Sequence, residues 1–211
     1  MGDTNSEFIF SIDPGIVNVG VVCLNYKTDR IHFANKLTIA PSLKSLTNEA
    51  EIIPRVYKLF FDPVSPYRTM INESRVVLIE IQMKRKFLLI QNIIGAFCFA
   101  FNLDYEFVSP KSIKGYFGTG KYSRLKKGIR VKDNHKANKV EAVSKAMELF
   151  PTHMSKIQIS KRDDVADALL QAYWYGKTKF LAEPRKATQR QGRKRSLKKP
   201  KESSKKRQKK T

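Results

Sequence analysis

The feature that most constrains the fold is a carboxylate inside an otherwise apolar segment. The stretch FIFSIDPGIVNVGVVCL begins at Phe8 and predicts two buried strands joined at a Pro-Gly turn, in which Gly15 is expected to adopt a positive φ. Asp13 stands at the end of the first strand, and Glu80 interrupts a second apolar segment, residues 75–82, in the same way. A single acid at a strand end usually caps the chain or forms one ion pair. Adjacent strands lie only about 4.8 Å apart, however, so these two acids can face each other.

A third acidic motif, DDVAD, opens a predicted helix over residues 161–180. Asp164 and Asp167 are three residues apart and share one helix face, whereas Asp163 points elsewhere and is expected to have a structural or outer-sphere role. At about 4 Å and an effective dielectric constant near 20, each pair of like charges costs about 4 kcal/mol. A fold therefore keeps such acids together only with raised pKa values or with a bound divalent cation. Oxygen donors without a His or Cys set favour Mg²⁺ or Mn²⁺.

The order of predicted elements indicates an α/β fold. Strands are predicted at 8–13, 17–25 and 30–39 as an antiparallel meander, then a helix at 46–61 that Pro54 divides, a strand at 75–82, a helix at 86–102, a strand at 104–110, a helix or turn from Ser112, a loop at 118–135, and helices at 136–150 and 161–180. Alternation of strands and helices in the middle of the chain predicts a mixed sheet flanked by helices.

The chain is strongly basic, with a formal net charge of +22. Pro184 to Thr211 contains 14 Lys or Arg residues and one acid, Glu202, and the rest of the chain still carries +9. We therefore expect a flexible N-terminus (1–7), one folded domain (8–180) and a disordered basic tail (181–211). The tail is either a solubilising segment or one that serves nuclear import or binds phosphate backbones, and the basic domain favours nucleic-acid contact.

The cysteines and the apolar segments indicate the cellular compartment and the kinds of partner to expect. Cys23 and Cys98 lie in apolar segments and predict buried thiols in a reducing, intracellular compartment rather than a disulfide or a zinc site. The longest apolar run, residues 87–101, is shorter than the roughly 20 residues that a membrane span needs and contains Gln91 and Asn92. We expect no membrane partner and no small-molecule substrate.

Five segments carry a resemblance to a known family. In chain order they are SIDPGIVNVG, VLIEIQ, VSPKSIK, NHKANKVEAV and KRDDVADALLQAYWY, and together they resemble the RNase H-like Holliday junction resolvases of the RuvC superfamily, above all the poxvirus and yeast mitochondrial branch. The resemblance covers residues 8–180. It implies an RNase H-like mixed sheet, with a three-strand antiparallel meander plus parallel strands, and a homodimer. It also implies an endonuclease that resolves four-way and other branched DNA by paired symmetrical nicks, acting in viral genome replication or recombination in the nucleus or at a cytoplasmic viral replication site.

The resemblance also implies roles for individual residues. Asp13, Glu80, Asp164 and Asp167 would hold two Mg²⁺ ions, for which Mn²⁺ would substitute, and Lys136 would act at the scissile phosphate, with Lys114 and Lys139 as alternatives. The basic residues expected to contact DNA are Lys84, Arg85, Lys111, Lys114, Lys121, Lys126, Lys127 and Lys139. The helix at 87–101 is apolar on nearly every side, and either half of it pairs with its copy across a two-fold axis or all of it is buried in one core.

Three other functions are compatible with parts of the sequence. ATPases of the actin, chaperone and sugar-kinase type share the DPGxxNxG pattern, but they need two such domains, for which this chain is too short. A nuclease of the same fold that acts on other branched DNA or on RNA–DNA hybrids fits the same acids. A non-catalytic, chromatin-like binding protein fits the basic tail but leaves the buried acids unexplained.

Overall fold

A computed structural model describes residues 6–42, 49–119 and 131–182, with the side chains of all of these except residues 49 and 131–136. Most of the N-terminal extension and almost all of the basic tail lie outside this range. The predicted flexibility of these two ends therefore stays a prediction.

Five strands form one mixed sheet, as the sequence predicts. The strands are β1 Phe8–Asp13, β2 Val19–Asn25, β3 Arg30–Leu37, β4 Val76–Glu80 and β5 Tyr105–Val108. Their order in the sheet is β3-β2-β1-β4-β5. β1, β2 and β3 make an antiparallel meander, while β4 runs parallel to β1 and β5 runs parallel to β4. β1 is thus the central strand, which explains why its sequence is apolar on both faces.

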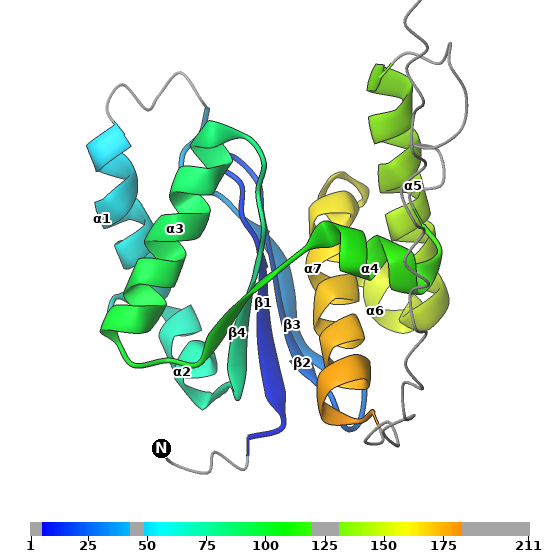
Figure 1. The fold of residues 1–211 in the computed structure, drawn as a ribbon, viewed down its shortest axis with the longest axis horizontal. Coiled ribbons are helices and arrows are strands. Elements are labelled where there is room, and N and C mark those ends of the chain that lie inside the picture. Colours follow the sequence, from blue (N-terminus) through cyan, green and yellow to red (C-terminus); the bar gives the residue numbers. More distant parts are fainter. Residues whose placement is uncertain (1–5, 43–48, 120–130, 183–211) are drawn as a thin grey trace, which may run out of the picture.

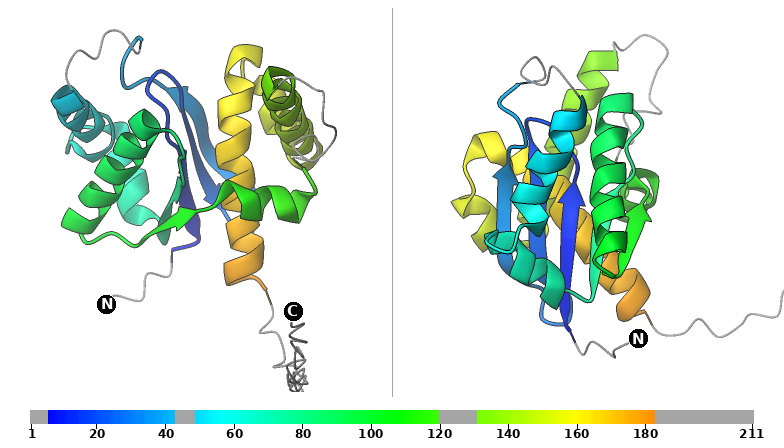
Figure 2. Two further views of the ribbon diagram at one scale, coloured as in Figure 1. Left: turned by 45° about the horizontal axis from the view of Figure 1, so that its top comes forward. Right: turned by 90° about the vertical axis from the view of Figure 1, so that its left-hand side faces the viewer.

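Helices cover both faces of the sheet. The helical segments are η1 Glu49–Glu51, α1 Ile52–Val56, η2 Tyr57–Phe61, α2 Pro66–Glu73, α3 Arg85–Ala100, α4 Pro110–Phe117, α5 Val131–Leu149, α6 Pro151–Lys156, η4 Ile159–Lys161, α7 Arg162–Tyr175 and η5 Gly176–Phe180. α1, α2 and α3 lie on one side, and α4, α5, α6 and α7 lie on the other (Figures 1 and 2). No helix of the described residues is long and apolar enough to cross a membrane.

The alternation of side chains along β1 assigns each residue to one of two cores. Phe10 and Ile12 pack in the core beneath α1, α2 and α3, whereas Ile9 packs in the core beneath α7. Ser11 and Asp13 have the parity of Ile9, so they face α7 as well. The central strand therefore presents its one carboxylate to the helix that carries the DDVAD motif.

Several sequence-based boundaries need correction. The structure adds α2 and α6, both of which begin at a proline, because proline at the first position of a helix loses no hydrogen bond. The sequence predicted the end of the preceding helix at residue 150 but not the helix that begins at Pro151. α5 begins at Val131, so the last five residues of the loop predicted over 118–135 are helical. The helix predicted over 46–61 is divided into η1, α1 and η2, and Pro54 lies within α1.

Gly15 also acts differently from the prediction. Among the described glycines only Gly118 has a positive φ. A Cβ atom on Gly15 would instead lie 1.8 Å from the backbone oxygen of Asn18, so the turn needs glycine because the chain approaches itself closely.

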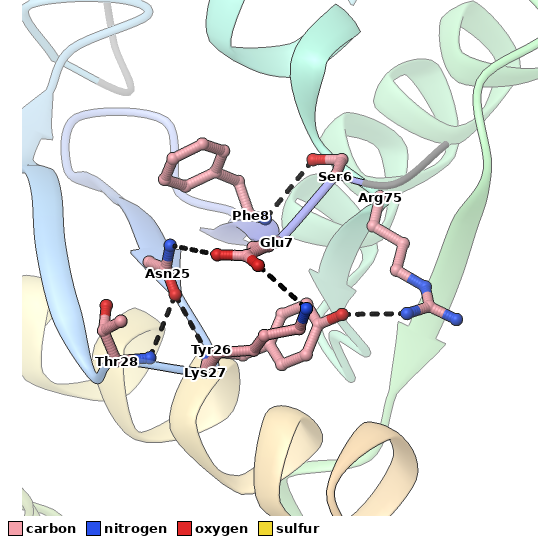
Figure 3. A network of polar contacts seen from close by, with 8 residues as sticks. All are labelled: Ser6, Glu7, Phe8, Asn25, Tyr26, Lys27, Thr28 and Arg75. Carbon is pink, nitrogen blue, oxygen red and sulfur yellow. Dashed lines mark hydrogen bonds and ion pairs between the residues drawn. The ribbon is translucent and has the colours of Figure 1, made fainter. Parts of the chain in front are cut away.

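The end of β1 opposite to Asp13 is held by a network of polar contacts (Figure 3). Glu7 accepts hydrogen bonds from Asn25 at 3.1 Å and from Lys27 at 2.8 Å, which joins the start of β1 to the end of β2. Arg75 donates to the hydroxyl of Tyr26 at 2.8 Å, and its guanidinium lies 4.1 Å from the ring centroid of Phe180 in η5. These contacts fix the start of β4 and the end of the α7 region to the sheet.

The two cysteines behave as the sequence predicts. Both are free and buried. Burial raises the pKa of Cys23 to about 11 and that of Cys98 to about 12, so both thiols stay protonated and unreactive at neutral pH.

The start of α7 lies against β2 because Gly20 has no side chain. A Cβ atom at Gly20 would lie 1.9 Å from the backbone oxygen of Asp164 and 3.5 Å from the Cβ of Ala168. Gly20 is also the register partner of Asp13 in β1. The glycine therefore determines how closely the DDVAD turn approaches Asp13.

Substitution of Gly20 by alanine is expected to displace α7 from the sheet. We predict a loss of about 1–3 kcal/mol in the free energy of unfolding, because the added methyl group overpacks a buried contact. Gly115→Ala is the matched control, since a Cβ there meets nothing within 4 Å in α4 and should be neutral or stabilising. Thermal or urea unfolding measures both, and equal stabilities for the two variants would contradict the assigned role of Gly20.

Candidate active site

A pocket of about 380 Å³ lies where β1 and β4 end and α7 begins. The four predicted acids all line it, namely Asp13, Glu80, Asp164 and Asp167. The other polar side chains around it are those of Asn18, Gln82, Lys84, Lys114, Asn138 and Lys139. Residues separated by as much as 154 positions in the sequence are thus brought to one cavity.

The topology of the sheet explains this convergence. β1 and β4 are adjacent and parallel, so their last residues, Asp13 and Glu80, lie at the same edge of the sheet. α7 packs on β1 and β2 with its first turn against Gly20. Asp164 and Asp167 are one turn apart on this helix, and both face the strand ends.

Burial and mutual repulsion raise the pKa values of the four acids. Burial, followed by the charges of Glu80, Asp167 and Asp164, raises the pKa of Asp13 well above its usual range. Burial and Asp167 raise the pKa of Glu80 to about 8, although Lys114 opposes this. Burial raises the pKa of Asp167 to about 6, although the positive charges of Lys114 and Lys139 oppose this. Burial and the negative charge of Asp163 raise the pKa of Asp164. The pocket therefore brings together carboxyl groups whose full ionisation it does not compensate.

Two lysines compensate part of this charge at the start of α7. Lys139 of α5 lies 2.6 Å from Asp163 and 3.8 Å from Asp164. Lys36 of β3 lies 3.5 Å from Asp164 on its other side. Burial disfavours ionisation of Asp163, but its hydrogen bond to Lys139 lowers the pKa of this carboxyl overall. Asp163 thus acts as the partner of Lys139 and not as a wall of the pocket, in agreement with its predicted outer role.

The donor set of the pocket fits a hard divalent cation. In the described part of the chain no three His, Cys, Asp or Glu side chains are grouped closely enough to hold a metal ion as they stand. The four acids nevertheless offer only oxygen donors around one cavity, which suits Mg²⁺ or Mn²⁺. The Oδ1 atom of Asn138 is buried without a hydrogen-bond partner, and the Oδ2 atom of Asp164 has only the ion pair with Lys36 at 3.5 Å, so both oxygens can serve as cation ligands.

The amide of Gln82 connects the two strand-end acids. Its Nε2 donates to the Oδ1 of Asp13 at 3.1 Å and lies 3.5 Å from the Oε1 of Glu80. Gln82 follows Glu80 by two residues in the segment IEIQ. An amide donor between two carboxylates offsets part of their repulsion and fixes their relative orientation.

The predicted lysine and DNA-binding residues divide into four groups. Lys84, Lys114 and Lys139 line the pocket, and Arg85 and Lys111 are exposed at the first turns of α3 and α4. Lys136 belongs to α5, but its side chain is not among those described. Lys121, Lys126 and Lys127 lie outside the described residues. The structure therefore brings Lys139 and Lys114 to the acids, and the role of Lys136 stays a prediction.

Sequence reasoning did not single out Lys36, Gln82 or Asn138. Gln82 had a recognisable signal, because it stands two residues after a buried acid at the end of a strand. Asn138 had a weaker one as the neighbour of Lys139. Lys36 had none, since only the packing of α7 on the meander brings the edge strand β3 close to Asp164.

Solved structures with the same architecture exist, although sequence comparisons find no relative. No protein-family model and no curated protein matches the chain. The solved structures that match it over most of its length include the following three. The RuvC of T. thermophilus in complex with a Holliday junction substrate is 14% identical, covers 81% of this chain and 94% of its own, and has a TM-score of 0.51.

The other two structures agree with the first. A Thermus thermophilus RuvC structure is 13% identical over 81% of this chain and 95% of its own, with a TM-score of 0.50. The yeast mitochondrial Holliday junction resolvase Ydc2 is 15% identical over 81% of this chain and 79% of its own, with a TM-score of 0.53. The chain has the RuvC-like RNase H fold. The fold expected from the five sequence segments is thereby confirmed, and the acidic pocket lies at the carboxyl ends of the central strands of this RuvC-like sheet.

The raised pKa values predict how stability depends on pH without metal. The folded-state pKa values of Glu80, about 8, and Asp167, about 6, lie above those of the unfolded chain. At low pH both groups are protonated in the folded and the unfolded chain, so they do not reduce the free energy of unfolding. As pH rises from about 4 to about 8, ionisation favours the unfolded chain and the free energy of unfolding falls. We expect Glu80→Gln and Asp167→Asn to raise the Tm of the EDTA-treated protein at pH 8 and to change it little near pH 4. Thermal melts across this range measure the effect, and a Tm difference that does not vary with pH would contradict the shifts.

Proposed function

We propose that the protein is a structure-specific DNA endonuclease that resolves four-way junctions by paired nicks and requires Mg²⁺. One observation carries the proposal: four carboxylates from β1, β4 and α7 meet in a single pocket of a RuvC-like fold. The T. thermophilus RuvC of the same fold was solved with a Holliday junction substrate. The raised pKa values of the acids support a site that needs cations to be fully ionised.

In this proposal Asp13, Glu80, Asp164 and Asp167 hold two Mg²⁺ ions. When bound, such ions activate water and stabilise the leaving oxygen of a phosphodiester. The protein orients the acids through Gln82 and Lys139, whose hydrogen bonds fix Asp13 and the start of α7. Lys114 lines the same pocket and places a positive charge near Glu80 and Asp167, where it can neutralise the charge that develops on the phosphate.

The proposed DNA path runs over the basic residues that surround the pocket. Lys84, Arg85 and Lys86 lie exposed where β4 passes into α3, and Lys111 and Lys114 lie on α4. Contacts of this kind bind the phosphate backbone and position the DNA without reading its sequence. Selection of a junction over a linear duplex would then depend on shape and on the spacing of two active sites.

Loss of one central acid should separate binding from cleavage. We expect Asp13→Asn to reduce cleavage of a synthetic four-way junction at least about 100-fold while leaving its Kd within a few-fold, because the amide keeps the shape but not the charge of a metal ligand. Gel-based cleavage and binding assays with Mg²⁺ measure both. Normal cleavage by Asp13→Asn would contradict the assignment.

Cleavage of a panel of nucleic-acid substrates tests the proposed preference for four-way junctions. Four-way junctions, flaps and RNA–DNA hybrids are each incubated with wild-type protein, with and without Mg²⁺. The proposal requires paired symmetrical nicks in the junction and Mg²⁺ dependence. Preferential cutting of hybrids or flaps would instead support the second candidate, a nuclease of the same fold with a different substrate, and binding without any cleavage would indicate a non-catalytic DNA-binding protein.

A second copy of the chain is the proposed partner of α3. One face of this helix packs on the sheet through Ile90, Ile94 and Cys98. The opposite face is exposed within the chain: the exposed fraction of Leu88 is 38% and that of Phe99 is 78%. The alternative of a wholly buried core helix is therefore wrong for the single chain. An apolar helix face of this kind suits an isologous contact, and paired nicks need two active sites.

Introduction of charge on this face should prevent association. We expect Phe99→Glu to convert a homodimer into a monomer at micromolar concentration and to uncouple the two nicks, because the carboxylate would be desolvated in an apolar interface. Val64→Glu is the control, since Val64 is 88% exposed in the loop between η2 and α2. Multi-angle light scattering reports the mass, and a wild-type protein that is monomeric and still nicks both strands together would rule out the dimer.

The viral setting, the intracellular location and the role of the basic tail remain predictions from the sequence resemblance and composition. The free, buried thiols of Cys23 and Cys98 are compatible with a reducing compartment.

A further inference from the structure

Gln91 is an unusual residue for the buried face of α3. Its exposed fraction is 5%, and its neighbours on that face are apolar. Burial of an amide is costly unless its polar atoms form hydrogen bonds. Both ends of this one are used: Oε1 accepts from the backbone N–H of Gln82 at 2.7 Å, and Nε2 donates to Oδ1 of Asn92 at 3.3 Å. The second bond sets the orientation of the amide, so that its oxygen faces Gln82.

The contact is made where the sheet ends. Ile81 donates its backbone N–H to the oxygen of Val108 at 2.8 Å, which is the last bond between β4 and the β5 strand. The next N–H, that of Gln82, is directed to Gln91 instead of to a strand. The side chain of Gln82 then returns toward the pocket and contacts Asp13 and Glu80. The backbone anchor therefore determines where the amide between the two acids lies.

We infer that Gln91 is a positioning residue for the metal-binding carboxylates, and that it acts through Gln82. This inference rests on the proposed function, because it assumes that Asp13 and Glu80 bind a divalent cation. Without the Gln91 oxygen, the segment after β4 would lose its anchor, and the amide of Gln82 would no longer hold the two acids in a fixed relation. Outer partners of metal ligands typically contribute about 10–100-fold to metal affinity or activity.

Mg²⁺ binding, measured as the rise in Tm during a Mg²⁺ titration, tests the inference without relying on cleavage. Gln91→Met keeps the length and burial of the side chain but removes the acceptor, and we expect it to raise the Mg²⁺ midpoint about tenfold. Gln82→Met should do the same. Since both act through one interaction, the double variant should shift the midpoint about tenfold rather than about 100-fold.

A matched control separates positioning from stability. Cys98→Ala removes a buried atom from the same face of α3 and should lower the metal-free Tm while leaving the Mg²⁺ midpoint unchanged. If Gln91→Met does not fold, Gln82→Met, which leaves the buried face of α3 unchanged, carries the test: a Mg²⁺ midpoint within about threefold of wild type there overturns the inference.

The outcomes distinguish this inference from the proposed function. A wild-type midpoint in Gln91→Met, or single effects that multiply in the double variant, would overturn the role of Gln91 and leave the metal site intact. If Mg²⁺ does not raise the Tm of the wild-type protein, the proposed metal site itself is wrong, and the positioning role falls with it.

Discussion

Repulsion among four carboxylates at one pocket is the constraint on which the rest of the structure depends. Asp13 and Glu80 end adjacent parallel strands, and Asp164 and Asp167 begin the helix packed over them. Their pKa values are raised because burial removes the water that would otherwise solvate their charges. Lys36, Lys139 and Gln82 compensate only part of this cost. Four buried carboxylates lower the stability of the fold, and cation binding is the simplest explanation for their presence together.

Other features of the fold help to bring the four acids together. The absence of a side chain at Gly20 lets the first turn of α7 approach β2. Polar contacts at the far end of the sheet, made by Glu7 and Arg75, keep β1, β2 and β4 in register away from the pocket. The alternating direction of side chains along β1 places Phe10 and Ile12 in one core and leaves Asp13 facing the other side. The rigid elements of the molecule thus converge on a site whose own charges oppose its formation.

The sequence predicted the sheet and the four acids because both leave local signals. Short apolar, β-rich segments mark the strands, and a carboxylate in such a segment, or three residues from another on a helix, is visible without coordinates. Lys36 could not be found in this way, since its contact with Asp164 depends on how α7 crosses the meander. The role of Gln91 could not be found in this way either. In the sequence it is one polar residue in an apolar helix, and only the structure shows its hydrogen bond to the end of β4. Helix boundaries were less predictable, because a proline such as Pro151 both ends one helix and starts the next.

The most direct test of the account is to locate a cation in the pocket. Crystals soaked in Mn²⁺ would be measured for anomalous scattering, which identifies the ion independently of any activity. The account predicts an anomalous peak within bonding distance of Asp13 and of at least one acid of α7, with the carboxylates turned toward it. Crystals that take up Mn²⁺ elsewhere but show no peak between the strand ends and α7 would contradict it.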